Sequence, residues 1–271
     1  MRTFSSWLLL LLCLALLSGC GKKEEHPTAP PEETVPAIAT VPATEPAETT
    51  VPETALPTEA PTQPSQPNLS IEHVPVEDVL LYFNEVVLDA EYFDIGNPNL
   101  VQKWTVPIRY ILYGAPTDED LDTLNHFANW LNTIDGFPGI AKTDDPTAAN
   151  LRIHFCDQEE MQTLMGEDYI GMDGAVTFWY ENHEIYDAII CIRTDLDQHL
   201  RSSVILEELY NGLGPVQDTW LREDSIIYGG YSEPQALTPT DELLLKLLYH
   251  PDILCGMDAA ECEEVIRQLY S

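Results

Sequence analysis

Two adjacent carboxylates, Glu207 and Glu208, lie inside an otherwise apolar stretch that is typical of a helix. Residues of an α-helix turn by about 100° each, so Glu207 and Asn211 face the same side, one turn apart. A carboxylate among apolar side chains is costly unless it is ion-paired, hydrogen-bonded or bound to a metal. This stretch is therefore the part of the sequence best suited to chemistry.

One use of these side chains is to bind a metal. The set Glu207, Asn211 and Gln217 offers only oxygen donors. Zinc in proteins is usually held by Cys, His or carboxylate groups, whereas oxygen donors favour a hard cation. A metal bound here is therefore expected to be Ca²⁺ or Mg²⁺.

The preferred interpretation is a buried hydrogen-bonded network without metal. In that case Glu207 and Glu208 would be neutralised by a nearby cation, with Arg201 or Arg222 as the candidates. Hydrolysis by Glu208 with no metal is the least favoured use, because nothing would then activate water or stabilise the oxyanion.

The segment from Ser203 to Asp218 resembles the active-site helix of metzincin metalloproteases, H-E-x-x-H-x-x-G-x-x-H. With Gly214 aligned, the resemblance places Glu208 at the position of the general base. It places the three zinc-ligand positions on Glu207, Asn211 and Gln217. None of these three is histidine, so the resemblance implies a relative of the metzincins with substituted ligands.

Two later segments extend this resemblance. Ser225–Tyr228 is similar to the Met-turn of metzincins, with Ile227 in the methionine position and Tyr228 as a further candidate catalytic residue. Leu237–Asp241 is similar to the start of their next helix. Over residues 76–271 the whole pattern is similar to an uncharacterised bacterial lipoprotein family, a domain of unknown function related to the zincins.

The elements that must position these residues follow from hydrophobic periodicity and turn signals. Apolar spacing predicts a first helix around 79–87, and alternation predicts a hairpin with a four-residue loop at 181–184. Further strands are expected at 106–114, 150–156, 175–180 and 185–192. Further helices are expected at 117–134, 157–170 (short), 197–213, 238–250 and 258–269. We therefore predict an α+β fold with a zincin-like mixed sheet of about four strands packed on helices, and a C-terminal helical part.

The N-terminal residues predict an export signal and a tether. Residues 1–20 carry Arg2 and a short apolar run, and they end in Leu-Ser-Gly before Cys20, which resembles a bacterial lipobox. Two acyl chains on Cys20 would anchor the protein stably to a membrane. Residues 21–74 are rich in Pro, Thr and Glu without apolar periodicity, which predicts a disordered linker before a domain at 75–271.

The charge restricts the partners of this domain. The 271-residue chain carries 46 acidic and 12 basic side chains, a formal charge of -34. Nucleic acid is excluded as a partner, because binding to phosphates needs a surface of Lys and Arg. A peptide or a protein of the cell envelope remains compatible with this charge.

The cysteines and aromatics give the last predictions. Cys255 and Cys262 flank the start of the last helix, and we predict a disulfide between them. Cys156 and Cys191 lie in strands and are expected to be small buried side chains. Trp179 is expected to be partly exposed between two core aromatics, on a strand that the metzincin resemblance places near a peptide-binding edge.

Together these features predict a lipid-anchored lipoprotein on the extracytoplasmic face of a bacterial cell membrane. Its domain is expected to bind or support other envelope components without catalysis. The alternative is a divergent metal-dependent peptidase that uses Glu208 as the general base.

Overall fold

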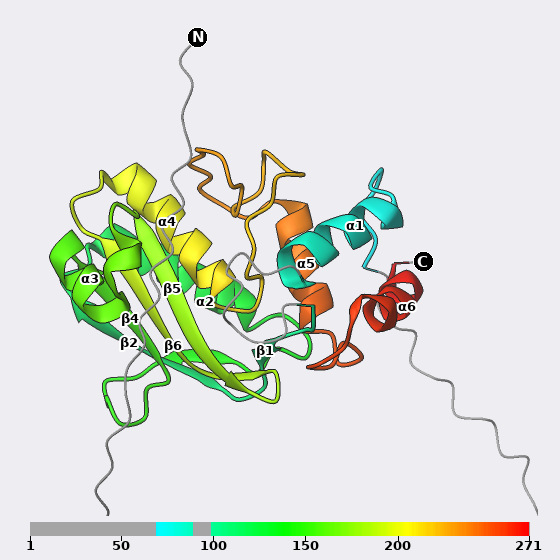
Figure 1. The fold of residues 1–271 in the computed structure, drawn as a ribbon, viewed down its shortest axis with the longest axis horizontal. Helices are drawn as coiled ribbons and strands as arrows, with labels where there is room; N and C mark the ends of the chain where they lie inside the picture. The colour runs from blue at the N-terminus through cyan, green and yellow to red at the C-terminus, as the bar shows by residue number, and fades with distance from the viewer. Residues whose placement is uncertain (1–68, 89–98, 271) are drawn as a thin grey trace, which may run out of the picture. The chain divides into compact units, whose positions relative to one another are not determined.

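A computed structural model describes residues 69–88 and 99–270 of the chain (Figure 1). The predicted signal peptide, the lipidated Cys20 and most of the predicted linker lie outside these residues. Residues 69–74, assigned to the linker by the sequence, contact the C-terminal end of the domain. The amide of Leu69 donates to the carbonyl of Leu269 at 3.1 Å, and the hydroxyl of Tyr270 donates to the carbonyl of Val74 at 2.7 Å.

The fold is α+β, with a mixed sheet packed against helices, as the sequence predicts, and most strand pairs of the sheet are parallel. The sheet has six strands, β1 (Lys103–Trp104), β2 (Ile108–Gly114), β3 (Ile140–Lys142), β4 (Leu151–Cys156), β5 (Gly174–Glu181) and β6 (Glu184–Arg193). Strands run in the order β1-β6-β4-β2-β3, with every pair on this path parallel, whereas β5 pairs antiparallel with β6. The expected number of about four strands is wrong, because β1 and β3 are only 2 and 3 residues long and show no alternation.

The described helices are α1 (Val76–Phe83), α2 (Asp118–Leu131), α3 (Gln158–Met165), α4 (Gln198–Asn211), α5 (Pro239–Leu248) and α6 (Ala259–Leu269). Three of them, α2, α5 and α6, begin at the predicted capping residues Thr117, Thr238 and Asp258. A π-helical turn, Asn84–Leu88, continues α1, and a 3-10 turn, Glu167–Tyr169, follows α3. Capping boxes at Thr117, Thr238 and Asp258 satisfy backbone amides of α2, α5 and α6. None of the helices in the described ranges is long and apolar enough to cross a membrane.

The hairpin between β5 and β6 differs from the prediction of a four-residue loop. Its turn has two residues, Asn182 and His183, both with positive φ (52° and 66°), as a tight turn between twisted strands requires. The register then shifts, so that Trp179 pairs with Asp187 but Tyr180 pairs with Ile185. Tyr186 is the extra residue of this bulge, and a bulge cannot be recognised from alternation alone.

The two faces of the sheet carry separate clusters. Ile153 and Phe155 of β4, and Ile190 and Ile192 of β6, belong to the main core shared with the helices. The alternate residues point to the opposite face. There, the buried Cys156 and Cys191 form a second cluster with α3, so the prediction that both are buried is confirmed. Trp179 is 41% exposed, as expected.

Lys103 of β1 is an unexpected buried cation. Its Nζ donates to the carbonyls of Leu248 at 2.8 Å and Ile253 at 2.5 Å, and it lies 5.7 Å from the centroid of the Tyr249 ring. Burial lowers the pKa of the Lys103 ammonium from 10.5 to about 8. The contacts tie the short strand β1 to the turn after α5.

This burial predicts a pH dependence of stability. Between about pH 8 and 10.5 the unfolded chain holds a proton that the folded chain has lost, so the free energy of unfolding should rise with pH. The full gain is on the order of 3 kcal/mol. Urea unfolding of wild type and Lys103→Met across this range should give a difference that grows in favour of wild type. A difference that stays constant with pH would contradict the lowered pKa.

Candidate functional site

Helix α4 lies at the centre of the domain and positions the predicted site (Figure 1). Its N-terminus is capped by Asp197, whose carboxylate accepts from the amides of His199 at 3.0 Å and Leu200 at 3.2 Å. The helix is buried almost all round, which fits a core element rather than a surface helix. Carboxylates on α4 therefore sit where solvation by bulk water is limited.

Glu208 is 8% exposed and lies against the first residue of β5. A Cβ on Gly174 would be 2.7 Å from Cγ and Oε1 of Glu208 and 2.4 Å from Cγ1 of Val204. The strand can approach α4 this closely only because residue 174 is glycine. The carboxylate predicted as a general base is thus held at the start of β5.

Glu207 and Asn211 are half-buried and lie one turn apart on α4, as the helical spacing predicts. The Oδ1 atom of Asn211 is buried and accepts no hydrogen bond. A buried amide oxygen without a donor is costly. This atom is therefore a free acceptor beside the predicted metal position.

Gln217 comes after the end of α4, where the chain turns sharply. Gly214 has φ +127°, and a Cβ there would lie 2.4 Å from the carbonyl oxygen of Gln102. The carbonyl of Gly212 accepts from the Trp104 indole at 2.8 Å, and that of Leu213 accepts from the Tyr249 hydroxyl at 2.7 Å. The amide of Gln217 then donates to the carbonyl of Val86 at 3.3 Å, which fixes Gln217 against the turn after α1.

Tyr228 lies on the segment that follows. It forms an isolated parallel bridge with Thr219, and its ring meets Trp220 edge-on at 5.8 Å. Ile227, in the methionine position of the resemblance, is fully buried in the main core. The bridge between Thr219 and Tyr228 closes the segment into a loop. The hydroxyl of Thr219 donates to Oε2 of Glu85 at 2.5 Å, which attaches this loop to the turn after α1.

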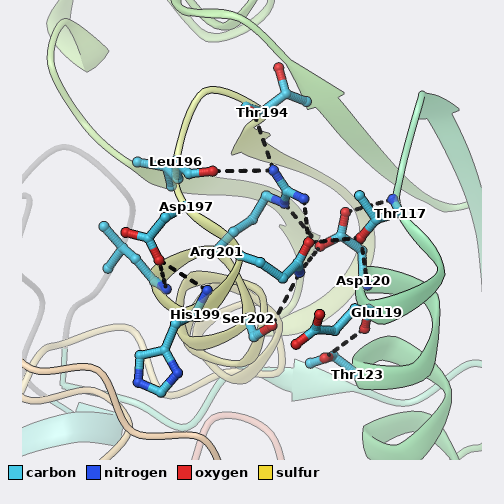
Figure 2. Close-up of polar contacts among 12 residues, drawn as sticks. Thr117, Glu119, Asp120, Thr123, Thr194, Leu196, Asp197, His199, Arg201 and Ser202 are labelled. Carbon is cyan, nitrogen blue, oxygen red and sulfur yellow. Dashed lines mark hydrogen bonds and ion pairs between the residues drawn. The ribbon is translucent and has the colours of Figure 1, made fainter.

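Arg201, one of the two candidate cations, forms an ion pair with an acid of another helix. Its Nε donates to Oδ1 of Asp120 on α2 at 2.9 Å, with side chains 9% and 1% exposed (Figure 2). Its remaining donors reach the carbonyls of Thr194 and Leu196 and the side chain of Gln198. The partner proposed for Glu207 or Glu208 is therefore the cation of a different ion pair, which joins α2 to the start of α4.

Arg222, the second candidate cation, pairs with Asp224 at 2.9 Å and lies 5.8 Å from the centroid of the Tyr82 ring. Both candidate arginines thus have another carboxylate as ion-pair partner, and the network predicted for Glu207 and Glu208 stays a prediction.

Asp241, in the first turn of α5, is a buried acid with several hydrogen-bond partners. Asp241 is 0% exposed, and its Oδ1 accepts from the hydroxyls of Tyr82 and Ser225, each at 2.8 Å. Its Oδ2 accepts from the amide and hydroxyl of Thr238 at 2.9 and 2.8 Å. This hydrogen-bond hub joins α1, α5 and the segment that resembles a Met-turn.

The donor set of the predicted metal position does not fit zinc. It consists of one carboxylate and two amides, and zinc sites rely on Cys, His and carboxylate. Among residues 69–88 and 99–270, no group of three or more His, Cys, Asp or Glu side chains is placed to hold a metal. The free Oδ1 of Asn211 suits a hard cation at most.

The two cysteines of the predicted disulfide, Cys255 and Cys262, lie near Lys103. Cys255 and Cys262 are free thiols in the structure, and burial raises the pKa of both, that of Cys262 to about 12. Cys255 donates weakly to the carbonyl of Lys103 at 3.8 Å. The disulfide stays a prediction.

The close contact at Gly174 predicts the effect of adding one methyl group. Gly174→Ala should lower the free energy of unfolding by about 1–3 kcal/mol, because the new Cβ collides with Val204 and Glu208. Chemical denaturation measures this. Combined with Val204→Ala, which removes the nearest colliding atom, the cost should be smaller than the sum of the two single changes. If the losses in free energy of unfolding from Gly174→Ala and Val204→Ala simply add, β5 is able to move away from α4 and the predicted collision does not occur.

The free edge of β5 lies beside this contact. The amide of Arg193 donates to the carbonyl of Asp173 at 3.0 Å. Asp173 and Arg193 are therefore a hydrogen-bonded pair, and every second pair along the β5–β6 ladder is hydrogen-bonded in the same way. By the alternation of antiparallel ladders, the backbone groups of Val176 and Phe178 then point away from β6. Within the described part of the chain β5 pairs with β6 alone, so no described strand pairs with these groups, and we call this side the open edge of β5.

Comparison with known proteins adds a family. Residues 77–268 match a family model described as Protein of unknown function (DUF2927), a span of more than half of the chain. A search of curated proteins finds no match.

Proposed function

The chain belongs to the family described as Protein of unknown function (DUF2927), and from this premise we propose that its domain binds an extended peptide without hydrolysing it. The observation that carries the proposal is the open edge of β5 beside Glu208. An exposed edge strand can accept another strand by backbone pairing.

The geometry of β5 supports this use. The regular part of the strand runs from Gly174 to Trp179, before the bulge at Tyr186. Backbone groups at Val176 and Phe178 would pair with a peptide on the open edge. The formal charge of -34 favours a basic peptide over an acidic one.

We further propose that the domain is a relative of the metzincins that has lost zinc chemistry. Its α4 helix, the sharp turn at Gly214 and the buried Ile227 lie in the order that the resemblance implies. The absence of histidine at the ligand positions 207, 211 and 217 argues against a zinc peptidase.

The proposed location is the extracytoplasmic face of a bacterial cell membrane. The support is sequence alone, namely the lipobox-like Leu-Ser-Gly-Cys ending at Cys20 and the Pro-rich residues after it. Mass spectrometry of the N-terminal peptide from a bacterial membrane fraction should find diacylglycerol on Cys20. An unmodified, cleaved N-terminus would reject the anchor.

The function is tested by binding and cleavage together. The purified protein is mixed with a panel of fluorescent eight-residue peptides of graded charge, in buffer with a metal chelator. Basic extended peptides should raise the fluorescence anisotropy, and mass spectrometry should find them intact after long incubation. No binding by any member of the panel would reject the proposal.

A metal-dependent peptidase with Glu208 as general base is the second candidate, because Oδ1 of Asn211 is a buried acceptor without a donor. Glu207, Asn211 and Gln217 would then hold a hard divalent cation. Elemental analysis after dialysis against Ca²⁺ or Mg²⁺ should find one ion per chain, which Glu207→Ala should remove. Peptide cleavage that is lost in Glu208→Gln would establish this candidate in place of the first.

A further inference from the structure

The second cluster of the domain is rich in sulfur. Its three buried members are Cys156, Met161 and Cys191, exposed by 2%, 0% and 0%, and each carries a sulfur atom. Met165 packs at its border. The cluster is separate from the main core and lies on the sheet face that α3 covers.

The strand register brings the two cysteines together. Cys191 of β6 pairs with His154 of β4, and Cys156 follows His154 by two residues on the same face. The two thiols are therefore diagonal neighbours on adjacent parallel strands.

Helix α3 closes the cluster from the other side. Asp157 caps this helix by accepting from the amide of Glu160 at 2.9 Å, and Met161 then points into the cluster one turn later. Gln158 holds the following turn, donating to the carbonyl of Tyr169 at 3.1 Å and accepting from the amide of Gly171 at 3.0 Å. Met161 therefore projects its thioether from a helix that is held by hydrogen bonds at its start and at the turn after it.

The neighbouring imidazole adds a second observation. The Nδ1 atom of His154 is buried and accepts no hydrogen bond, and it lies 3.8 Å from Oε1 of Glu160. The His154 ring stacks on the ring of Tyr113, with centroids 4.6 Å apart. The border of the cluster therefore carries a buried polar nitrogen without a hydrogen-bond partner.

We propose that Cys156, Cys191 and Met161 form a binding site for Cu(I). Two thiolates and a thioether are soft donors, which select Cu(I) over hard cations. Binding releases the two thiol protons to solvent, and the resulting Cu(I) complex with two thiolates carries one net negative charge. No electron transfer is required. The site uses no side chain of α4 and no backbone group on the open edge of β5.

The test is a competition for Cu(I) with the purified full chain. Reduced protein is titrated under anaerobic conditions into the coloured Cu(I) complex of bicinchoninate, and loss of colour measures transfer. Wild type should remove one more equivalent of Cu(I) than Cys191→Ser. Met161→Leu, which conserves volume, should weaken the affinity on the order of tenfold, the size of effect typical at metal sites.

Two matched controls separate this site from other sulfur atoms. Cys262→Ser removes a thiol that is equally buried in the main core, and Met257→Leu changes a thioether outside the cluster. Both should keep the wild-type equivalent, and circular dichroism should show all four variants folded. Because proton release accompanies binding, the affinity should also rise with pH.

The proposal is overturned if wild type and Met161→Leu bind Cu(I) equally well, or if Cys262→Ser loses the same equivalent as Cys191→Ser. It is also overturned if mass spectrometry of the untreated protein finds Cys156 and Cys191 joined in a disulfide that persists in the reductant. Loss of peptide binding, in contrast, would leave this site unaffected.

Discussion

Replacing Asp241 with asparagine is expected to lower the free energy of unfolding by at least about 3 kcal/mol, because several buried donors would lose their acceptor. The carboxylate accepts hydrogen bonds from Tyr82, Ser225 and Thr238, and the amide of Ile226 lies 3.3 Å from Oδ2. Asparagine at residue 241 would replace one of the two carboxylate oxygens with an NH₂ group, which is a donor and would face donors. Burial raises the pKa of Tyr82 far above its ordinary value, so that hydroxyl stays a donor.

The neighbouring residue offers a matched control for this experiment. Glu242 is on the same turn of α5, is 36% exposed and pairs with Lys246 four residues later. Glu242→Gln should cost less than about 1 kcal/mol. Urea denaturation at neutral pH compares the two variants. If both cost the same, the hydrogen-bond hub at Asp241 does not hold α1, α5 and the segment around Ser225 together.

Replacing Arg201 with methionine is expected to cost about 3–5 kcal/mol, because it leaves the carboxylate of Asp120 buried without its cation. Burial by itself would raise the pKa of Asp120, but hydrogen bonds from Gln198, Thr117 and Arg201 outweigh burial and lower it. Stability from this carboxylate is therefore present above its ordinary pKa and is lost as the pH falls through the lowered value. In Arg201→Met that acid-side loss should become smaller.

A double-mutant cycle makes this prediction specific to the pair. Asp120→Asn removes the carboxylate charge that Arg201→Met would leave unpaired. The double variant should therefore lose less free energy of unfolding than the sum of the losses in the two single variants. Arg267→Met is the comparison, since the ion pairs of Arg267 with Glu77 and Glu263 are exposed and should contribute little. Additive costs for Asp120 and Arg201 would contradict a coupled buried pair.

Local signals were sufficient to predict most of the fold. The capping pattern Thr-Asp-Glu-Asp at Thr117 predicted α2, and alternation at 150–156 predicted β4 with the correct inward face. Short strands were missed because β1 makes its two pairs only with Glu184 and Ile185, at the start of β6. A two-residue strand has no period that a sequence pattern could reveal.

The candidate site was predictable only along one element. Apolar spacing correctly predicted the helix α4, on which Glu207 and Asn211 lie one turn apart. The partner of Arg201 lies 81 residues away in the chain, on α2, so spacing could not identify it. The same reason applies to Asp241, which is 159 residues from Tyr82. Such long-range pairs depend on how elements pack, and no local rule encodes this.

The central claim is that the open edge of β5 pairs with a peptide, and one substitution tests it directly. Val176→Pro removes the backbone N–H that the ladder phase directs away from β6, a position where edge strands tolerate proline. Val176→Ala keeps this N–H and serves as the control. Fluorescence anisotropy with a basic extended peptide should show binding by wild type and Val176→Ala and its loss in Val176→Pro. Equal binding by all three, with the fold intact by circular dichroism, would contradict strand addition at β5.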